Sequence, residues 1–311
     1  MYAIQAVNVS KTYPNGVQAL SNLSLTIQEG EVFSLLGKNG AGKSTLIHIL
    51  TSLAKHDTGN ITIFDKDLQK DNHAIRFLIA CVFQKVSVDT NLTLTENMMF
   101  QSKLYKIPHE EALARMKQLI HEFELSSYEK YPIASYSGGI KRRLDIAVNM
   151  MSNPKILFLD EPTVGMDIQS RKAMWRMIQK IRNDFHTTIV LTTHYLEEAD
   201  ALSDTICILR DGHAVCQGSP SELKQYLKQD TIRIQFLDKE ALSQTKQLLD
   251  NLSRPYTLDH REIRIDTKNS HDLQELTAFV LKHDIAFKGI ERSQPTLEDV
   301  FLRLTKKEDN A

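Results

Sequence analysis

The sequence predicts an α/β fold for the first two thirds of the chain, followed by a smaller α+β domain. Short apolar runs alternate with helical periodicity over most of the 311 residues, which is typical of a parallel sheet covered by helices. After about residue 225, strands of period two replace the apolar runs. The composition, 41% hydrophobic and 25% charged, is that of a globular protein with a sizeable core.

The α/β domain, residues 1–225, is marked by three buried strands. EVFSLLG at 31–37 precedes a predicted helix at 44–54, and KILFLDEP at 155–162 and TTIVLTTH at 187–194 come later. The segment between the last two strands repeats apolar residues at helical spacing. We assign to the core its stripe of Ile168, Met174, Trp175, Ile178, Ile181 and Phe185.

A mostly helical insertion is predicted from about residue 86 to 150. Its clearest helix is HEEALARMKQLIHEFEL at 109–125, where the apolar residues share one face. That face consists of Ala112, Met116, Leu119, Ile120 and Phe123.

The second predicted domain covers residues 230–311. TIRIQF (231–236) and EIRID (262–266) alternate isoleucine or phenylalanine with polar residues, as half-buried strands do. Two amphipathic helices lie among them, with apolar positions Leu242, Leu248, Leu249 and Leu252 in one and Leu273, Leu276 and Val280 in the other.

A last helix is predicted to start at Thr296. Asp299, three residues on, completes an N-terminal capping pair with it. Its apolar side carries Leu297, Val300, Phe301 and Leu304.

Charge and hydropathy exclude several function classes. Lys and Arg number 38 against 39 Asp and Glu, so no overall field attracts nucleic acid, and no nucleic-acid partner is expected. No apolar run reaches the roughly 20 residues that span a bilayer, and no secretory signal is visible. The sequence has three cysteines, Cys81, Cys207 and Cys216, which form no metal-binding pattern. We expect them to be small buried residues without a metal or redox role.

A phosphate-binding loop lies between the first buried strand and its helix. The segment GKNGAGKS fits G-x-x-x-x-G-K-[ST], and the strand–loop–helix context is what that motif requires. Glycines let backbone N–H groups converge on phosphates, Lys43 reaches the β/γ oxygens and Ser44 ligates Mg²⁺. The predicted nucleotide-binding residues are Gly37, Lys38, Asn39, Gly40, Ala41, Gly42, Lys43, Ser44 and Thr45.

An acidic pair ends the strand ILFLDEP. A parallel sheet delivers its strand ends to one edge, so this pair is expected beside the phosphate-binding loop. Asp160 would hold the Mg²⁺ shell, and Glu161 would activate the attacking water as general base. The sequence therefore predicts that the chain binds and hydrolyses ATP.

The segment YSGG completes a set of motifs in a fixed order. With Tyr136, Ser137, Gly138 and Gly139 in place, residues 1 to about 225 resemble the ATP-binding subunit of an ABC transporter. YSGGxKRRL and the terminal PTLEDVFLRLT resemble the exporter branch that includes bacterial drug-resistance and antibiotic self-protection systems. Two departures are Tyr136 and Ile140, where many members have Leu and Gln.

The resemblance implies roles for further residues. Tyr13 would stack on adenine, Gln84 would contact Mg²⁺ and the attacking water, and His194 would contact the γ-phosphate. The segment from Tyr136 to Gly139 would bind ATP in trans, on the facing subunit of a head-to-tail dimer. A second copy of the chain or a paralogue is therefore expected, with a homodimer favoured.

The resemblance also implies a separate multi-span membrane permease, with this chain peripheral on the cytoplasmic face of the membrane. The carboxy-terminal domain would be an accessory domain, with a dimerising or regulatory role left open. A non-transport ABC-type ATPase remains an alternative, although tandem ATPase domains, a long coiled coil or a basic patch would be expected there. A P-loop small-molecule kinase would not explain YSGG.

Overall fold

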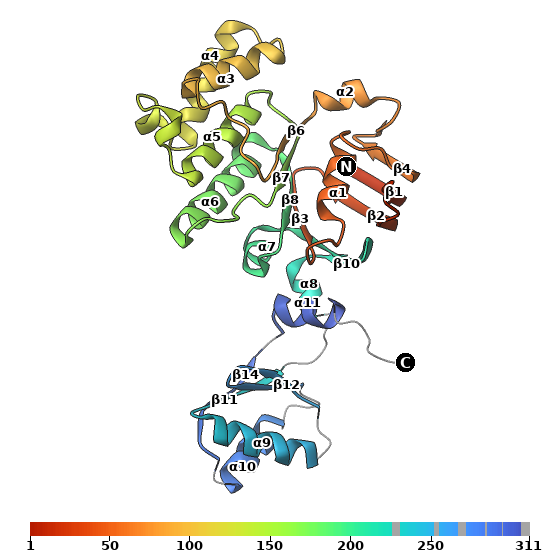
Figure 1. Cartoon of the computed structure of the whole chain (residues 1–311), viewed down its shortest axis with the longest axis vertical. Coiled ribbons are helices and arrows are strands. Elements are labelled where there is room, and N and C mark those ends of the chain that lie inside the picture. The colour runs from red at the N-terminus through yellow and green to blue at the C-terminus, as the bar shows by residue number, and fades with distance from the viewer. Residues whose placement is uncertain (226–230, 252–254, 267–271, 284, 294, 306–311) are drawn as a thin grey trace. The chain divides into compact units, whose positions relative to one another are not determined.

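The computed structural model describes residues 1–225, 231–251, 255–266, 272–283, 285–293 and 295–305 (Figure 1). The chain divides into two compact units, Met1–Pro220 and Ser221–Ala311. We call them the first and the second unit, and each is described by itself.

The first unit is built on a six-stranded sheet in the order β10-β9-β3-β8-β7-β6. Neighbouring strands are parallel from β9 to β6, and β10 pairs antiparallel with β9 at the edge. The strands are β3 (Val32–Leu36), β6 (Ile79–Val82), β7 (Ile156–Asp160), β8 (Thr188–Thr193), β9 (Thr205–Arg210) and β10 (His213–Gly218). Because β8 enters between β3 and β7, the carboxyl ends of β3, β8, β7 and β6 follow one another along one edge.

Each face of this sheet belongs to a different hydrophobic core. In β7, Ile156 and Phe158 face helix α1 (Lys43–Leu50) and a second sheet, whereas Leu157 and Leu159 face the helical insertion. This alternation buries the strand on both faces, which explains its uninterrupted apolar sequence.

The second sheet of the first unit was not predicted. It is antiparallel in the order β2-β1-β4-β5, with β1 (Tyr2–Thr12), β2 (Gln18–Gln28), β4 (Thr58–Ile63) and β5 (Lys66–Asp67). The register between β1 and β2 shifts at several places, one of them between Ala6 and Val9. Such bulges break the two-residue alternation from which strands are recognised.

The helical insertion comprises α3 (Leu94–Leu104), α4 (His109–Glu122) and α5 (Gly138–Met150), drawn together in Figure 1. The predicted apolar face of α4 is confirmed, because Ala112, Met116, Leu119, Ile120 and Phe123 are all buried. Two short 3₁₀ turns, Ser126–Tyr128 and Ile133–Ser135, lead from α4 into α5.

Three further helices complete the first unit: α2 (Asn72–Arg76), α6 (Ile168–Phe185) and α7 (Leu196–Leu202). One prediction for α6 is wrong. Ile168 was assigned to the core, but its side chain is 71% exposed. It is the first residue of the helix, directly after the N-cap Asp167, and the buried stripe starts further along at Met174.

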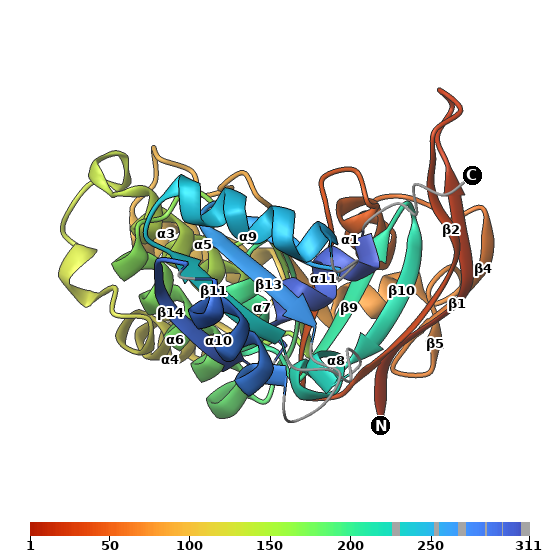
Figure 2. The same ribbon diagram turned by 90° about the horizontal axis from the view of Figure 1, so that it is seen from below.

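The second unit has the element order β11-α9-β12-β13-α10-β14, followed by α11, as in ferredoxin-like folds. Figure 2 shows its strands and helices from below. A short helix, α8 (Pro220–Gln225), spans the boundary between the units. The bounds are β11 (Thr231–Phe236), α9 (Lys239–Asn251), β12 (Thr257–Asp259), β13 (Glu262–Asp266), α10 (Asp272–Lys282), β14 (Phe287–Ser293) and α11 (Leu297–Thr305).

The core of the second unit follows the predicted pattern. Its antiparallel sheet has the order β12-β13-β11-β14. The predicted inward residues Ile232, Ile234, Phe236, Ile263 and Ile265 are buried, together with Leu249, Leu276 and Val280 from α9 and α10. Leu252, also predicted for α9, lies outside the described residues.

The predicted cap of the last helix is confirmed. The Thr296 backbone N–H donates to Asp299 Oδ2 over 2.8 Å, and the Asp299 N–H donates to Thr296 Oγ1 over 3.2 Å. Asp299 also accepts a hydrogen bond from Arg264 Nη1 at 3.2 Å, which fixes α11 to strand β13. Among the described residues, the structure contains no helix with the length and apolar character needed to cross a membrane.

Candidate functional site

The phosphate-binding loop leaves β3 and turns directly into α1. Gly40 and Gly42 have φ of 82° and 105°, a region that side-chain-bearing residues rarely adopt. A Cβ on Gly42 would lie 2.6 Å from the carbonyl oxygen of Ala19, and one on Gly37 would lie 2.7 Å from that of Leu209. The glycines of the motif are therefore required by backbone conformation and by close packing.

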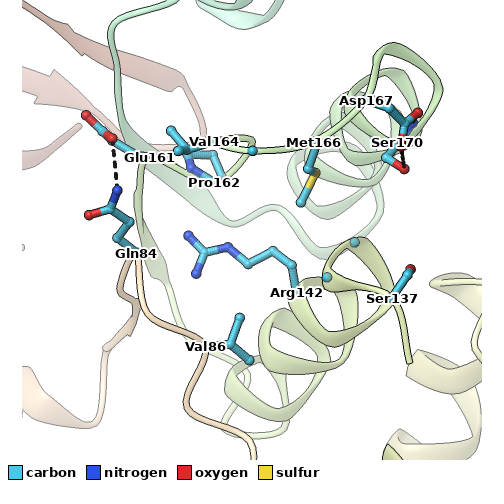
Figure 3. Close-up of a pocket in the computed structure, with 13 residues that line it drawn as sticks. Gln84, Val86, Ser137, Arg142, Glu161, Pro162, Val164, Met166, Asp167 and Ser170 are labelled. Atoms are coloured by element: carbon cyan, nitrogen blue, oxygen red, sulfur yellow. Dashed lines mark hydrogen bonds between the residues drawn. The ribbon is translucent and has the colours of Figure 1, made fainter. Parts of the chain in front are cut away.

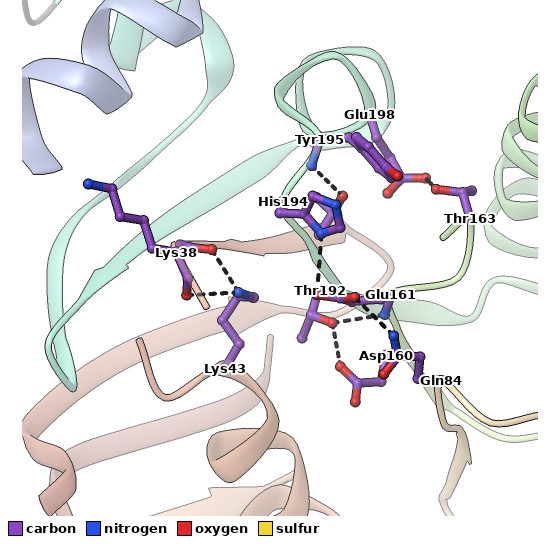
Figure 4. Close-up of polar contacts among 12 residues, drawn as sticks. Lys38, Lys43, Gln84, Asp160, Glu161, Thr163, Thr192, His194, Tyr195 and Glu198 are labelled. Carbon is purple, nitrogen blue, oxygen red and sulfur yellow. Dashed lines mark hydrogen bonds and ion pairs between the residues drawn. The ribbon is translucent and has the colours of Figure 1, made fainter. Parts of the chain in front are cut away.

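Lys43 lies buried inside the curve of this loop, with 6% of its surface exposed. Its ammonium donates to the carbonyl oxygens of Gly37 at 2.7 Å and Lys38 at 3.2 Å (Figure 4). Burial lowers the pKa of Lys43, while the carboxylates of Glu161 and Asp160 act in the opposite direction. A buried cation held by neutral carbonyls is available to an incoming anion.

A cavity of about 490 Å³ opens over the loop. Tyr13 is half-buried at its rim, and its hydroxyl lies 3.3 Å from Thr45 Oγ1. Ten of the residues predicted for the nucleotide site line this cavity: Tyr13, Asn39, Gly40, Gly42, Lys43, Ser44, Thr45, Gln84, Asp160 and Glu161. Val17, Gln18 and Ala19 also line it and were missed by the sequence analysis, because no motif marks them.

Asp160 is the last residue of β7 and Glu161 follows it, so the acidic pair lies at the end of the strand, as predicted. Asp160 is 7% exposed, and its Oδ1 accepts a hydrogen bond from Thr192 Oγ1 at 2.6 Å. The same threonine oxygen accepts the backbone N–H of Glu161 at 2.9 Å. Thr192 of β8 thus orients both acidic residues. The sequence analysis missed this role because Thr192 is distant in sequence from Asp160 and Glu161.

Glu161 brings three strand ends together. Gln84 Nε2 donates to its Oε2 at 3.4 Å, and His194 Nδ1 lies 3.4 Å from its Oε1 (Figure 4). Its backbone has φ of 47°, a left-handed conformation that costs a non-glycine residue about 1 kcal/mol or more. Gln84 and His194 therefore both lie at the carboxylate of Glu161, and the three residues predicted to be catalytic are close together.

The YSGG segment forms the N-terminus of α5. Ser137 is the N-cap, and its Oγ accepts the Ile140 N–H at 3.4 Å. Space around a Cβ on Gly138 is open, so its backbone is accessible. Ser137, Gly138 and Gly139 line a cavity of about 370 Å³ that Gln84 and Glu161 also border (Figure 3).

The two departures from the family pattern have structural explanations. The Tyr136 side chain is buried, and its hydroxyl donates to the carbonyl oxygen of Tyr128 at 2.6 Å. Ile140 is 8% exposed and packs in the core of the helical insertion. The predicted role of Tyr136 in nucleotide binding stays a prediction; in this structure its side chain packs against the turns before α5.

The residues around the phosphate-binding loop fit a magnesium ion. The exposed Ser44 hydroxyl, the Asp160 carboxylate and the Gln84 amide offer hard oxygen ligands, which Mg²⁺ prefers. The described residues contain no group of three or more His, Cys, Asp and Glu suited to a metal. Mg²⁺ binds in proteins through one or two carboxylates, water and substrate phosphates, and the Asp160 carboxylate meets the first of these requirements.

Two family models match the chain. One, described as ABC transporter, covers residues 20–164, and the other, described as ATP-binding protein DrrA1-3-like, C-terminal domain, covers 218–305. The daunorubicin/doxorubicin resistance ATP-binding protein DrrA of Streptomyces peucetius is 34% identical, covering 97% of this chain and 92% of that protein. The Nod factor export ATP-binding protein I of Sinorhizobium fredii is 32% identical, covering 98% and 87%.

Solved structures that resemble the chain are also ATP-binding cassettes. The structure of cbiO1 from Clostridium perfringens, part of the ABC transporter complex cbiONQ, matches with a TM-score of 0.66 and 26% identity over 73% of this chain and 93% of that chain. The dimeric ATP-binding cassette MJ0796 bound to ADP and Pi matches with a TM-score of 0.62 and 28% identity over 70% and 98%.

Proposed function

The chain belongs to the ATP-binding subunits of ABC transporters, and from that membership we propose how its own residues bind and hydrolyse ATP to drive export through a separate membrane permease. The observation that carries the proposal is the convergence of Gln84, Glu161 and His194 beside the phosphate-binding loop.

Binding begins at the loop. The ammonium of Lys43 exchanges its bonds to Gly37 and Lys38 for the β- and γ-phosphate oxygens, which are charged and therefore stronger acceptors. The backbone N–H groups and the N-terminal dipole of α1 add to this attraction. Tyr13, at the rim of the cavity, provides an aromatic face for the adenine.

Hydrolysis is assigned to Glu161 as general base. Its carboxylate accepts the proton of the attacking water, which Gln84 orients, and His194 contacts the γ-phosphate. Mg²⁺, held by Ser44, Asp160 and Gln84, would supply charge stabilisation for the transferred phosphoryl group. Thr192 keeps Asp160 and the backbone of Glu161 in register with each other.

A second copy of the chain completes the site. Ser137, Gly138 and Gly139 present a hydroxyl and open backbone at the N-terminus of α5, and we assign them to the γ-phosphate bound by the facing subunit. ATP binding closes this head-to-tail dimer, and hydrolysis with product release reopens it. The similarity to a dimeric cassette bound to ADP and Pi supports this arrangement.

The permease would receive this motion through the helical insertion, around residues 91–105, at the cytoplasmic face of the membrane. Relatives named for drug resistance and Nod factor export support export as the direction. For the second unit we propose a dimerising or regulatory role.

Glu161→Gln tests the catalytic assignment. The amide cannot accept the water proton, so the variant should bind ATP normally, hydrolyse it at least about 100-fold more slowly, and accumulate as an ATP-bound dimer. Size-exclusion chromatography with and without Mg-ATP measures the dimer, and phosphate release measures turnover. Wild-type turnover by this variant would refute Glu161 as the base.

Affinity purification of a tagged chain from detergent-solubilised membranes tests the partner. A multi-span membrane protein recovered in stoichiometric amount supports the transporter subunit. Recovery with ribosomal or repair proteins instead would favour a non-transport ATPase, which the relatives do not favour.

A further inference from the structure

Helix α5 buries two opposite charges that the mechanism above does not use. Arg142 is 3% exposed and Asp145 is fully buried. Arg142 Nη1 lies 3.8 Å from Asp145 Oδ2, one helical turn away. Burial lowers the pKa of Arg142 and raises that of Asp145, so each charge is costly alone and needs its partner.

Arg142 contacts the backbone immediately before two catalytic residues. Its Nη1 donates to the carbonyl oxygen of Phe83, the residue before Gln84. Its Nη2 donates to the carbonyl oxygen of Asp160, the residue before Glu161, at 2.9 Å. Figure 3 shows the guanidinium extended from α5 towards the segments that carry Gln84 and Glu161.

Asp145 holds the other end of the Gln84 loop. Its carboxylate accepts the Ser87 hydroxyl at 2.6 Å and the Ser87 backbone N–H at 3.4 Å. The loop from Phe83 to Ser87 is thus attached to one turn of α5 at both ends, with Gln84 between the two attachments.

We propose that Arg142 and Asp145 are positioning residues that hold Gln84 and Glu161 in their hydrolytic arrangement and link both to the helix that starts at Ser137. The inference rests on the proposed function, in which Glu161 is the base and Ser137 contacts ATP across the dimer. A displacement of α5 on dimer closure would then move Gln84 and Glu161 together, since the same guanidinium bonds both backbones.

The chemistry of the side chain explains why arginine occupies this position. A planar guanidinium presents donors in a fixed fork and can satisfy two carbonyls at once, whereas a lysine ammonium on this stem reaches one. Both bonds go to backbone oxygens, and Arg142 is not among the residues that line the cavity over the phosphate-binding loop, so its effect on Gln84 and Glu161 is on their placement. Misplacing a catalytic group by about 1 Å costs on the order of 100-fold in rate.

The test separates hydrolysis from binding in the full-length chain. Arg142→Gln should lower kcat on the order of 100-fold, and Arg142→Lys should lower it by about tenfold, because one attachment is kept. The dissociation constant for Mg-ATP, measured by fluorescent-nucleotide titration, should change less than about threefold, since the nucleotide cavity is intact. The milder Ser87→Ala, which removes one hydroxyl bond to Asp145, should lower kcat by a few-fold and guards against a failure to fold.

Arg143→Gln is the matched control. Arg143 is the next residue of α5 and pairs with Glu124 at 3.0 Å, away from Phe83 and Asp160. The same loss of charge there should leave kcat and ATP affinity near wild type.

Two results would overturn the inference. One is wild-type kcat in both Arg142→Gln and Ser87→Ala. The other is an equal loss of ATP binding and kcat in folded Arg142→Lys, which would indicate a general structural role. If Glu161→Gln itself hydrolyses ATP at the wild-type rate, the proposed catalytic assignment has failed; if Glu161→Gln is inactive while the Arg142 variants are active, only the positioning role has failed.

Discussion

The two units of this chain bury different kinds of side chain. The first unit carries charged and polar groups in its interior, among them Lys43, Arg142, Asp145 and Asp160. In the described part of the second unit, the core is almost entirely aliphatic and aromatic, and its charged network of Arg233, Arg264, Glu262 and Asp299 remains partly exposed.

The buried charges of the first unit belong to its candidate site, whereas the apolar core of the second unit serves to stabilise its fold. Buried charge is costly unless it is paired, and the first unit concentrates it along the sheet edge that holds the phosphate-binding loop. The second unit gains stability by burying apolar surface and shows no such concentration among its described residues. Substitution of the buried charges along that sheet edge should therefore affect mainly activity, and substitution of the apolar core of the second unit should affect mainly stability.

The largest effect is expected from Lys43→Ala. Removing the ammonium deletes charge-assisted bonds to phosphate, each about 1.5–3 kcal/mol, so ATP affinity should fall at least about 100-fold. The melting temperature without nucleotide should change little, because the two hydrogen bonds of the Lys43 ammonium there go to neutral carbonyl oxygens. Fluorescent-ATP titration measures this, with Lys66→Ala on the exposed surface of β5 as the control of equal charge loss. Undiminished affinity would refute the loop assignment.

Ile234→Ala should have the largest effect on the second unit. The side chain is 1% exposed in the central strand β11, and truncation of a buried isoleucine costs about 2–5 kcal/mol. ATP affinity should remain, since Ile234 belongs to a core made of second-unit residues. Calorimetry and ATP titration measure the two outcomes. Leu258→Ala, at a position 49% exposed in the same sheet, should cost no more than about 0.5 kcal/mol.

The same capping device occurs in both units and allows a direct comparison. Thr93 and Glu96 cap α3, and Thr296 and Asp299 cap α11. Thr93→Ala and Thr296→Ala should each lower the free energy of unfolding by about 1 kcal/mol, the first in the first unit and the second in the second. Chemical denaturation followed by unit-specific probes measures this, and Thr→Ser at each position should restore most of the loss. If either variant lowered the free energy of unfolding of both units equally, the two units would not unfold independently, and the prediction would be wrong.

The smallest effect concerns Glu31, a buried charge of the first unit outside the candidate site. Burial raises the pKa of Glu31 above its usual 4.5, despite hydrogen bonds from Gln28 and Thr205. A raised pKa in the folded state means that folding favours the protonated form. The stability that this adds is present below about pH 4.5 and is lost as the pH rises through the folded-state pKa.

Glu31→Gln removes this dependence. Relative to the variant, wild type should lose stability as the pH rises from about 4 to 7. Urea denaturation at several pH values measures the difference, and a difference independent of pH would contradict the shifted pKa.

Much of the fold was predictable because local patterns were strong. The uninterrupted apolar run of β7 marks a strand buried on both faces, and the alternation of Ile232, Ile234 and Phe236 marks one buried on a single face. The antiparallel sheet of β1, β2, β4 and β5 was missed because bulges interrupt its alternation. Ile168 was misplaced because helical spacing alone does not say where the core begins along a helix.

The candidate site shows the same division. Motif chemistry named Lys43, Asp160 and Glu161, whose side-chain types suit phosphate, metal and water, and the family resemblance added Gln84 and His194. Neither named Thr192 or Arg142, because their contacts join residues about 20 to 60 positions apart.

The sequence by itself determined the chemical groups and the strands and loops that carry them, since these depend on local periodicity and on motif spacing. The sequence also placed the acidic pair beside the phosphate-binding loop, but tertiary structure alone decided the strand order and the side-chain contacts that follow from it. Along the chain the order is phosphate loop, Gln84, Glu161 and His194, whereas along the sheet edge β8 lies between β3 and β7 and brings His194 beside Glu161. The physical reason is that strand order is set by pairing and packing between distant segments, which local sequence preferences do not encode.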